Sequence, residues 1–179
     1  MSGCYSHSSF IGKPYGSKIF PKGKGTGHLY LLRWDPALIT LSLSHLTQIL
    51  YQTDISTVIS KLNIKPGDVV IESGTGSGSL SCSILAALMG RGLLYTFEFN
   101  EGRVENAKEL FKKIGYENYQ VFHRDVMGLG FLATDNETYK LQPADSIFLD
   151  LPRPYDVIKH AKLALKKSGR ICCFSPCIE

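Results

Sequence analysis

Four acidic residues stand at or just after the ends of four predicted strands. Glu72, Glu98 and Asp150 end apolar runs, and Asp125 follows another run by two positions. Ligands in open parallel sheets bind beyond the carboxyl ends of the strands, so these acids are expected to meet in one pocket. Each acid alone could cap a helix or lie in a solvated loop. Four buried acids without partners would be costly, and the set therefore favours a nucleoside pocket.

A glycine-rich turn follows the first of these acids. Its sequence is Glu72-Ser73-Gly74-Thr75-Gly76-Ser77-Gly78-Ser79, between the apolar run 69–71 and an amphipathic segment. This order predicts a buried strand, a tight turn and a helix. Glycines let a backbone approach a ligand closely, and a helix N-terminus offers free N–H groups. We therefore expect a nucleotide-type cofactor against this turn.

The glycine spacing distinguishes two cofactor classes. A dinucleotide fingerprint is G-x-G-x-x-G, whereas here the third glycine, Gly78, comes one position early. Glu72 suits a cationic ligand better than a pyrophosphate. S-adenosylmethionine carries a sulfonium and an ammonium group and no phosphate, so the sequence favours it. Glu98 follows Gly78 by twenty positions, as expected for an acid that binds a ribose diol, and Asp125 is placed to accept from an exocyclic amine.

The elements that hold these residues alternate between strands and helices. We expect strands at 68–73, 93–99, 119–123, 145–150 and 170–174, helices at 77–88, 101–114 (capped by Asn100) and 154–165, and a long loop over 126–143. Upstream, residues 36–62 carry two helical segments, the second capped by Asp54. This alternation predicts an α/β fold with a doubly wound, mostly parallel sheet. Five strands would leave a sheet edge uncovered, so we expect truncation at the C-terminus, and the abrupt start suggests truncation at the N-terminus too.

Size and composition fit one globular core. The 179 residues are 44% hydrophobic and 20% charged. No apolar run reaches the ~20 residues that a membrane span needs, and no secretory signal is expected. The five cysteines include no C-x-x-C pair, which argues against a disulfide framework or a zinc site and for a reducing compartment. No metal is expected.

Residues 1–35 form a separate basic segment before the domain at 36–179. Its cations all precede the first acid, Asp35, and aromatic residues are interleaved with them: Lys13, Lys18, Lys22, Lys24 and Arg33, with Tyr15, Phe20, Tyr30 and Trp34. Loops and one short strand around 29–32 are expected. Two interpretations stay open. The segment is either a solvated, partly disordered arm or a surface that meets phosphates and stacks on bases.

Several stretches from about residue 12 to the last residue carry a family resemblance. They are Gly16-Ser17-Lys18, Thr47-Gln48-Ile49-Leu50-Tyr51, the glycine turn, Phe97-Glu98-Phe99, Phe148-Leu149-Asp150-Leu151-Pro152 and Phe174-Ser175-Pro176-Cys177-Ile178-Glu179. The chain resembles the catalytic subunit of eukaryotic tRNA adenine-58 N1-methyltransferases. The glycine motif is common to many methyltransferases, whereas segment 48–51 and the final five residues are far more specific. The resemblance implies a Rossmann-like class I methyltransferase, with residues 1–35 as the remnant of a small tRNA-gripping β-domain.

The resemblance also implies roles for single residues. The cofactor S-adenosylmethionine would be held by Leu50, Glu72, Gly74, Thr75, Gly76, Ser77, Gly78, Ser79, Glu98, Arg103, Asp125, Val126 and Asp150. The substrate would be contacted by Gln48, Ile49, Tyr51, Leu151, Pro152 and Arg153. Tyr51 would either stack on the target base or fill the core. Leu46 and Arg153 depart from the residues expected in close relatives, and either could alter tRNA contacts.

The implied reaction transfers a methyl group to N1 of adenine 58 in the tRNA T-loop and leaves S-adenosylhomocysteine. The base must be extruded from the folded tRNA, and Asp150 would accept from its N6 amine. The resemblance further implies a nuclear two-plus-two heterotetramer with a noncatalytic paralogue. Three alternatives stay open: a noncatalytic RNA-binding subunit, a methyltransferase for a protein or small molecule, and a nicotinamide oxidoreductase. The retained acids and glycines argue against the noncatalytic subunit. The basic aromatic segment argues against a protein or small-molecule substrate. The glycine spacing argues against the oxidoreductase.

Overall fold

A computed structural model describes residues 3–44, 47–133 and 138–175 of the chain. The chain divides into two compact units, Met1–Asp35 and Pro36–Glu179. Leu46 and the terminal stretch 176–179, both named in the predictions, lie outside the described residues.

The first unit contains a short antiparallel hairpin. Strand β1 (Lys18–Ile19) pairs with β2 (Leu29–Tyr30), after a 3-10 turn at His7–Ser9. The predicted strand around 29–32 is therefore present but two residues long. Its partner β1 was not predicted, because a two-residue strand is too short to show an alternating pattern.

A five-stranded parallel sheet forms the centre of the second unit. Its strands are β3 (Val69–Ser73), β4 (Leu93–Glu98), β5 (Tyr119–His123), β6 (Ala144–Asp150) and β7 (Leu165–Phe174). Their order in the sheet is β5-β4-β3-β6-β7. The direction of strand addition reverses between β3 and β6, which makes the carboxyl ends of these two strands the topological switch point of the sheet. The predicted doubly wound α/β fold is confirmed.

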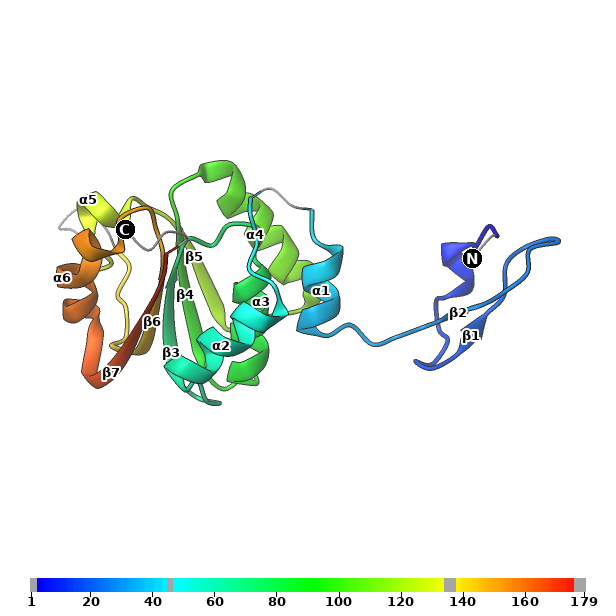
Figure 1. Ribbon diagram of the computed structural model, residues 1–179, viewed down its shortest axis with the longest axis horizontal. Helices are drawn as coiled ribbons and strands as arrows, with labels where there is room; N and C mark the ends of the chain where they lie inside the picture. The colour runs from blue at the N-terminus through cyan, green and yellow to red at the C-terminus, as the bar shows by residue number, and fades with distance from the viewer. Residues whose placement is uncertain (1–2, 45–46, 134–137, 176–179) are drawn as a thin grey trace. The chain divides into compact units, whose positions relative to one another are not determined.

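Helices cover both faces of this sheet, as Figure 1 shows. They are α1 (Pro36–Ser42), α2 (Gln52–Leu62), α3 (Ser79–Leu88), α4 (Glu101–Ile114), α5 (Val126–Leu129) and α6 (Pro154–Ala164). The first four pack on one face, and α5 and α6 pack on the other. Asn100 caps α4 as predicted, since its side chain accepts from the Arg103 N–H at 3.1 Å.

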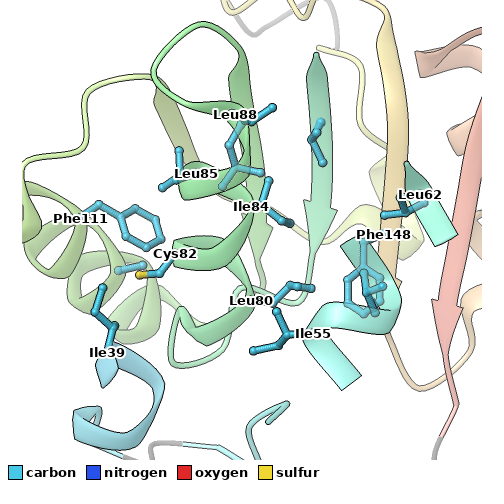
Figure 2. Close-up of a cluster of buried hydrophobic side chains, with 14 residues drawn as sticks. Ile39, Ile55, Leu62, Leu80, Cys82, Ile84, Leu85, Leu88, Phe111 and Phe148 are labelled. Carbon is cyan, nitrogen blue, oxygen red and sulfur yellow. The ribbon is translucent and has the colours of Figure 1, made fainter. Parts of the chain in front are cut away.

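Two hydrophobic clusters, one on each face, hold the layers together. Val70 of β3 points to the cluster with α1 to α4, whereas its neighbours Val69 and Ile71 point to the cluster with α5 and α6. Figure 2 shows the first cluster, in which Ile84 and Phe111 are fully buried between helices and sheet. Apolar side chains on both faces explain why the strands read as continuous hydrophobic runs.

The start of α2 differs from the prediction. The helix begins at Gln52, and Tyr51, in an extended conformation, occupies the N-cap position. The Tyr51 carbonyl accepts the first helical hydrogen bond, from the Ile55 N–H at 3.0 Å. Asp54 therefore lies inside the first turn, where its charge complements the positive end of the helix instead of capping it.

Two further boundaries differ downstream. The predicted loop 126–143 begins with the four-residue helix α5, which is too short for a periodic signal. Strand β7 begins at Leu165, five residues before the predicted start. Regular pairing with β6 covers only Arg170–Phe174, and the register shifts before it, where Ser168 has a φ of 67°. The predicted range 170–174 is thus the part of β7 with regular register.

Candidate active site

Two adjoining cavities open at the carboxyl ends of the strands, at the switch point. The larger has a volume of about 390 Å³ and is lined by Thr47, Gln48, Ser73, Gly74, Gly76, Glu98, Phe99, Arg103, Arg124, Asp125, Val126, Met127, Asp150, Leu151 and Pro152. The smaller, about 30 Å³, shares part of this wall and adds Ile49, Leu50, Glu72, Thr75, Ser77, Ser79, Leu80 and Phe148. The structure therefore brings all four predicted acids to one place: Glu98, Asp125 and Asp150 line the larger cavity, and Glu72 and Asp150 line the smaller.

The glycines of the turn serve different purposes. Gly74 (φ 93°) donates to the Phe97 carbonyl at 2.9 Å, and a Cβ at this position would overlap the Asp150 carbonyl. Gly76 lines both cavities. Gly78, a predicted cofactor residue, lines neither cavity. A Cβ there would meet Leu110 of α4 at 3.0 Å, so close packing of the two helices requires this glycine.

Glu98 is buried and held by three donors. Its Oε2 accepts from the Gly76 N–H at 2.9 Å. Its Oε1 accepts from the Asn100 N–H at 2.9 Å and from the Arg103 guanidinium at 2.7 Å. The side chain thus ties the glycine turn to the start of α4. A carboxylate offers about four acceptor positions, so one remains for a further donor.

Glu72 is more deeply buried and is held by hydroxyl groups. Ser81 donates to its Oε2 at 2.6 Å and Thr96 donates to the same oxygen at 2.8 Å. Burial raises the pKa of Glu72 to about 7, against the lowering effect of these two hydrogen bonds; the negative charges of Asp150 and Glu98 add to the rise. The sequence predicts that Glu72 faces a cationic ligand. In the structure, Glu72 lines the smaller cavity.

Asp150 lies between the two cavities and lines both. Burial raises the pKa of its carboxyl group, and the charge of Glu98 raises it further. Leu151 and Pro152 continue the wall of the larger cavity. Asp150 is therefore a partly buried carboxyl at the point where a ligand in either cavity would be within its reach.

Asp125 and Arg124 shape the opposite wall. Asp125 caps α5, because its Oδ1 accepts from the Met127 N–H at 3.0 Å. Arg124, which the sequence reading missed, is buried and donates to the carbonyls of Gly130 at 2.7 Å and Leu132 at 2.8 Å. These bonds fix the segment after Asp125. No sequence pattern marks a buried arginine whose partners are backbone carbonyls.

The segment 47–50 forms another wall of the site. Gln48, Ile49 and Leu50 line the smaller cavity, and the Leu50 carbonyl accepts from the Ser79 hydroxyl at 3.0 Å. Thr47, not singled out as a site residue in the sequence, lines both cavities.

Two predicted substrate residues lie beside the cavities and not in their walls. Tyr51 is 45% exposed, which contradicts the alternative that it fills the core; its stacking on the target base stays a prediction. Arg153 pairs with Asp156 at 3.2 Å at the start of α6 and is exposed. Both side chains are accessible to a macromolecule, and neither touches the space that a small ligand would fill.

The charges of the site favour a cation. Its acids are Glu72, Glu98, Asp125 and Asp150, and its cations, Arg103 and Arg124, already interact with Glu98 and with backbone carbonyls. Across the described ranges, no cluster of three or more His, Cys, Asp or Glu side chains is arranged to hold a metal ion. No helix within those same ranges is long and apolar enough to cross a membrane.

Comparison with known families and curated relatives gives a consistent result. A family described as tRNA methyltransferase complex GCD14 subunit matches residues 27–179. The chain is 45% identical to a tRNA (adenine(58)-N(1))-methyltransferase catalytic subunit from Dictyostelium discoideum and 44% identical to the one from Candida albicans. These matches cover 99% of this chain but only 56% and 52% of the two relatives, so the chain spans about half their length.

Solved structures share the fold. A SAM-dependent O-methyltransferase from Thermotoga maritima has a TM-score of 0.82 at 26% identity, covering 98% of this chain and 62% of that one. A tRNA (m1A58) methyltransferase from Aquifex aeolicus has a TM-score of 0.74 at 25% identity, covering 96% of this chain and 63% of that one.

Proposed function

Because the chain belongs to the family of tRNA methyltransferase complex GCD14 subunits, we propose that it is the catalytic part of a tRNA methyltransferase, acting on N1 of adenine 58 in the T-loop. The names of the relatives from Dictyostelium discoideum and Candida albicans support this reaction. The observation that carries the proposal is the convergence of Glu98, Asp125 and Asp150 on one cavity beside the glycine turn.

The residues present fit S-adenosylmethionine. The larger cavity, about 390 Å³, falls within the usual size of small-molecule sites. Glu98 keeps an acceptor position for a ribose hydroxyl, and Asp125 and Val126 would meet the adenine. The backbone at Gly74 leaves room that a side chain would fill. When bound, this cofactor supplies a methyl group on a positively charged sulfur.

Asp150 is our candidate for the chemistry. An ionised Asp150 would accept a hydrogen bond from the N6 amine of the target adenine, which orients the base and draws electron density toward N1. Its place in the walls of both cavities supports contact with both substrates. Most of the acceleration would come from alignment of the reacting atoms, which the fixed backbone of the turn and of Asp150 provides.

We assign tRNA contacts to two regions. In the first unit, the Lys18 ammonium lies 5.6 Å from the centre of the Tyr30 ring, and Tyr15 and Phe20 are mostly exposed. Cations beside exposed rings suit phosphates and unstacked bases. In the second unit, Gln48 and the exposed Tyr51 and Arg153 would meet the extruded base and its neighbours.

The partner and location are part of the same proposal. We assign a noncatalytic paralogous subunit in a two-plus-two heterotetramer, and a nuclear location. The description of the family as a subunit of a complex supports a partner. Light scattering of the chain, with and without co-expressed candidate subunits, tests the stoichiometry.

A methyl-transfer assay tests the reaction. Labelled S-adenosylmethionine is incubated with the chain, its partner subunit and a tRNA transcript, and the matched control transcript carries guanine at position 58. Label in the first transcript alone supports the proposal. Binding of tRNA without transfer would favour a noncatalytic subunit, transfer to protein or small molecules would favour another methyltransferase, and displacement of the cofactor by a nicotinamide dinucleotide would favour an oxidoreductase.

A further inference from the structure

Glu72 is the one acid of the site that the proposed reaction does not use. We infer that Glu72 senses the charge of the ligand: its carboxyl group holds a proton in the ligand-free site and releases it when a cationic ligand occupies the adjoining cavity. Binding of S-adenosylmethionine is then coupled to proton release, and the pocket discriminates between the sulfonium cofactor and its neutral thioether product. This inference rests on the proposed function, since it concerns the same pocket.

The position of Glu72 makes its charge sensitive to the ligand. The side chain is 1% exposed, yet it borders the smaller cavity together with Asp150. The segment 47–50 on the other side of that cavity contributes only uncharged side chains. A cation in this space would therefore face two carboxyl groups with little intervening water, where charges interact more strongly than in bulk solvent.

Among the residues that the structure describes, the groups packed around Glu72 contribute no compensating positive charge. From β4 it faces Thr96 and the acid Glu98, from β6 the acid Asp150, and from α3 Ser81 and Cys82. Burial, with the charge of Glu72, raises the pKa of the Cys82 thiol to about 12, so this group stays neutral. The nearby Arg103 guanidinium is bonded to Glu98. The environment therefore favours the protonated carboxyl until a ligand brings a positive charge.

A chain of hydroxyl groups links Glu72 to the glycine turn. Thr96 donates its single proton to Glu72 Oε2 at 2.8 Å, and its oxygen lies 2.6 Å from the Thr75 hydroxyl. Because Thr96 has no second proton, Thr75 must be the donor in that pair when Glu72 is ionised. When Glu72 is protonated, these directions are reversed: the carboxyl group donates to Thr96 and Thr96 donates to Thr75. Moving each proton one group along the chain then leaves Glu72 ionised and delivers one proton from Thr75, which lines the cavity. This proton passes to solvent, and no bond of the ligand breaks.

The pKa of Glu72, raised by burial to about 7, agrees with this geometry. At pH 7 such a group is about half protonated in the ligand-free chain, so a ligand that fully ionises it would release about half a proton, and nearly one at about pH 6. The same linkage makes the ligand bind about tenfold more weakly at about pH 6 than at about pH 8.

Calorimetric titration of the full chain tests the inference. S-adenosylmethionine and S-adenosylhomocysteine are each titrated at pH 6, 7 and 8 in two buffers with different ionisation enthalpies, and the buffer dependence of the heat gives the protons released. We expect release with S-adenosylmethionine and distinctly less with S-adenosylhomocysteine. Glu72→Gln should abolish this difference, whereas the matched control Glu109→Gln, on the exposed side of α4, should retain it.

Carbon-13 NMR of the glutamate carboxyl groups adds a readout without ligand. A resonance that titrates near pH 7 in the wild-type chain and is missing from Glu72→Gln supports the inference. Two results would overturn the inference about Glu72 and leave the proposed function standing. One is equal proton release for both ligands; the other is release that persists in Glu72→Gln and is lost in Asp150→Asn. A folded chain that binds neither ligand would overturn the proposed function as well.

Discussion

Gly74 and Asp150 approach each other so closely that no side chain fits between them. A Cβ on Gly74 would overlap the Asp150 carbonyl oxygen and lie 3.1 Å from the Asp150 Cβ. The two residues follow or end the neighbouring strands β3 and β6. The glycine turn and the proposed catalytic acid therefore share one packed boundary, and a shift in one moves the other.

Replacing Gly74 tests this boundary, with Gly67→Ala as a matched control. Gly67 has nearly the same φ, 95° against 93°, but has no atom within 4 Å of a Cβ. Gly67→Ala should cost about 1–2 kcal/mol of unfolding free energy from the left-handed backbone alone, and Gly74→Ala about 2–5 kcal/mol because the clash adds to it. Denaturant unfolding measures both. Equal losses in the two variants would contradict the proposed packing constraint.

Asp150→Asn should separate catalysis from binding. The variant keeps the size of the side chain but loses the negative charge, so methyl transfer should fall about 100-fold or more. The affinity for S-adenosylmethionine should change less. Asp156→Asn, an exposed acid of the next helix, is the control. Since burial and Glu98 raise the pKa of Asp150, wild-type transfer should decline on acidification at a higher pH than an ordinary aspartate would give. Undiminished turnover by Asp150→Asn would refute its role.

Glu98→Ala should affect both the fold and the cofactor. It removes the acceptor of Gly76, Asn100 and Arg103, and leaving such donors unpaired costs about 1–3 kcal/mol. Calorimetry should show loss of S-adenosylmethionine binding, while a circular dichroism melt shows a folded chain of lower melting temperature. Glu101→Ala, three positions along on the exposed start of α4, should leave binding intact. Wild-type affinity in Glu98→Ala would exclude the ribose contact.

Glu72→Gln should change the pH dependence of stability in a defined direction. The pKa of Glu72 is about 7 in the folded chain and 4.5 ordinarily, so between these values the folded state binds more protons than the unfolded state. The stability of the wild type relative to the variant should therefore fall by about 3 kcal/mol as the pH rises from 4.5 to 7. Denaturant titrations at several pH values measure this difference, and a constant difference would show that Glu72 is not perturbed.

Much of the fold could be predicted because the central strands β3, β4 and β6 are largely buried on both faces. The predicted ranges of these three strands, 68–73, 93–99 and 145–150, each depart from the observed bounds by one residue at one end. The errors fall where local pattern carries little information. Two-residue strands, the four-residue α5 and the irregular start of β7 are each too short or too irregular for periodicity, and their positions depend on tertiary contacts.

The candidate site could be predicted in part for a different reason. Parallel strands place their carboxyl ends at one edge, so Glu98, Asp125 and Asp150 were expected together. Arg124 could not be found, because its partners are carbonyls that only the folded loop brings near. The packing role of Gly78 could not be predicted either, because it depends on close contact with Leu110, a residue of another helix.

The strand order has a consequence for synthesis. The contact between Glu72 and Thr96 joins residues 24 positions apart, whereas the contact between Val69 and Asp145 spans 76 positions. At roughly 5–20 residues per second, β4 leaves the ribosome seconds before β6 does. The glycine turn and Glu98 can thus assemble on the nascent chain before β6, the strand that pairs with the other edge of β3, has been synthesised. Among the four acids of the site Asp150 is synthesised last, so the methyl transfer proposed for it requires that translation has passed β6, the fourth strand of the sheet in chain order.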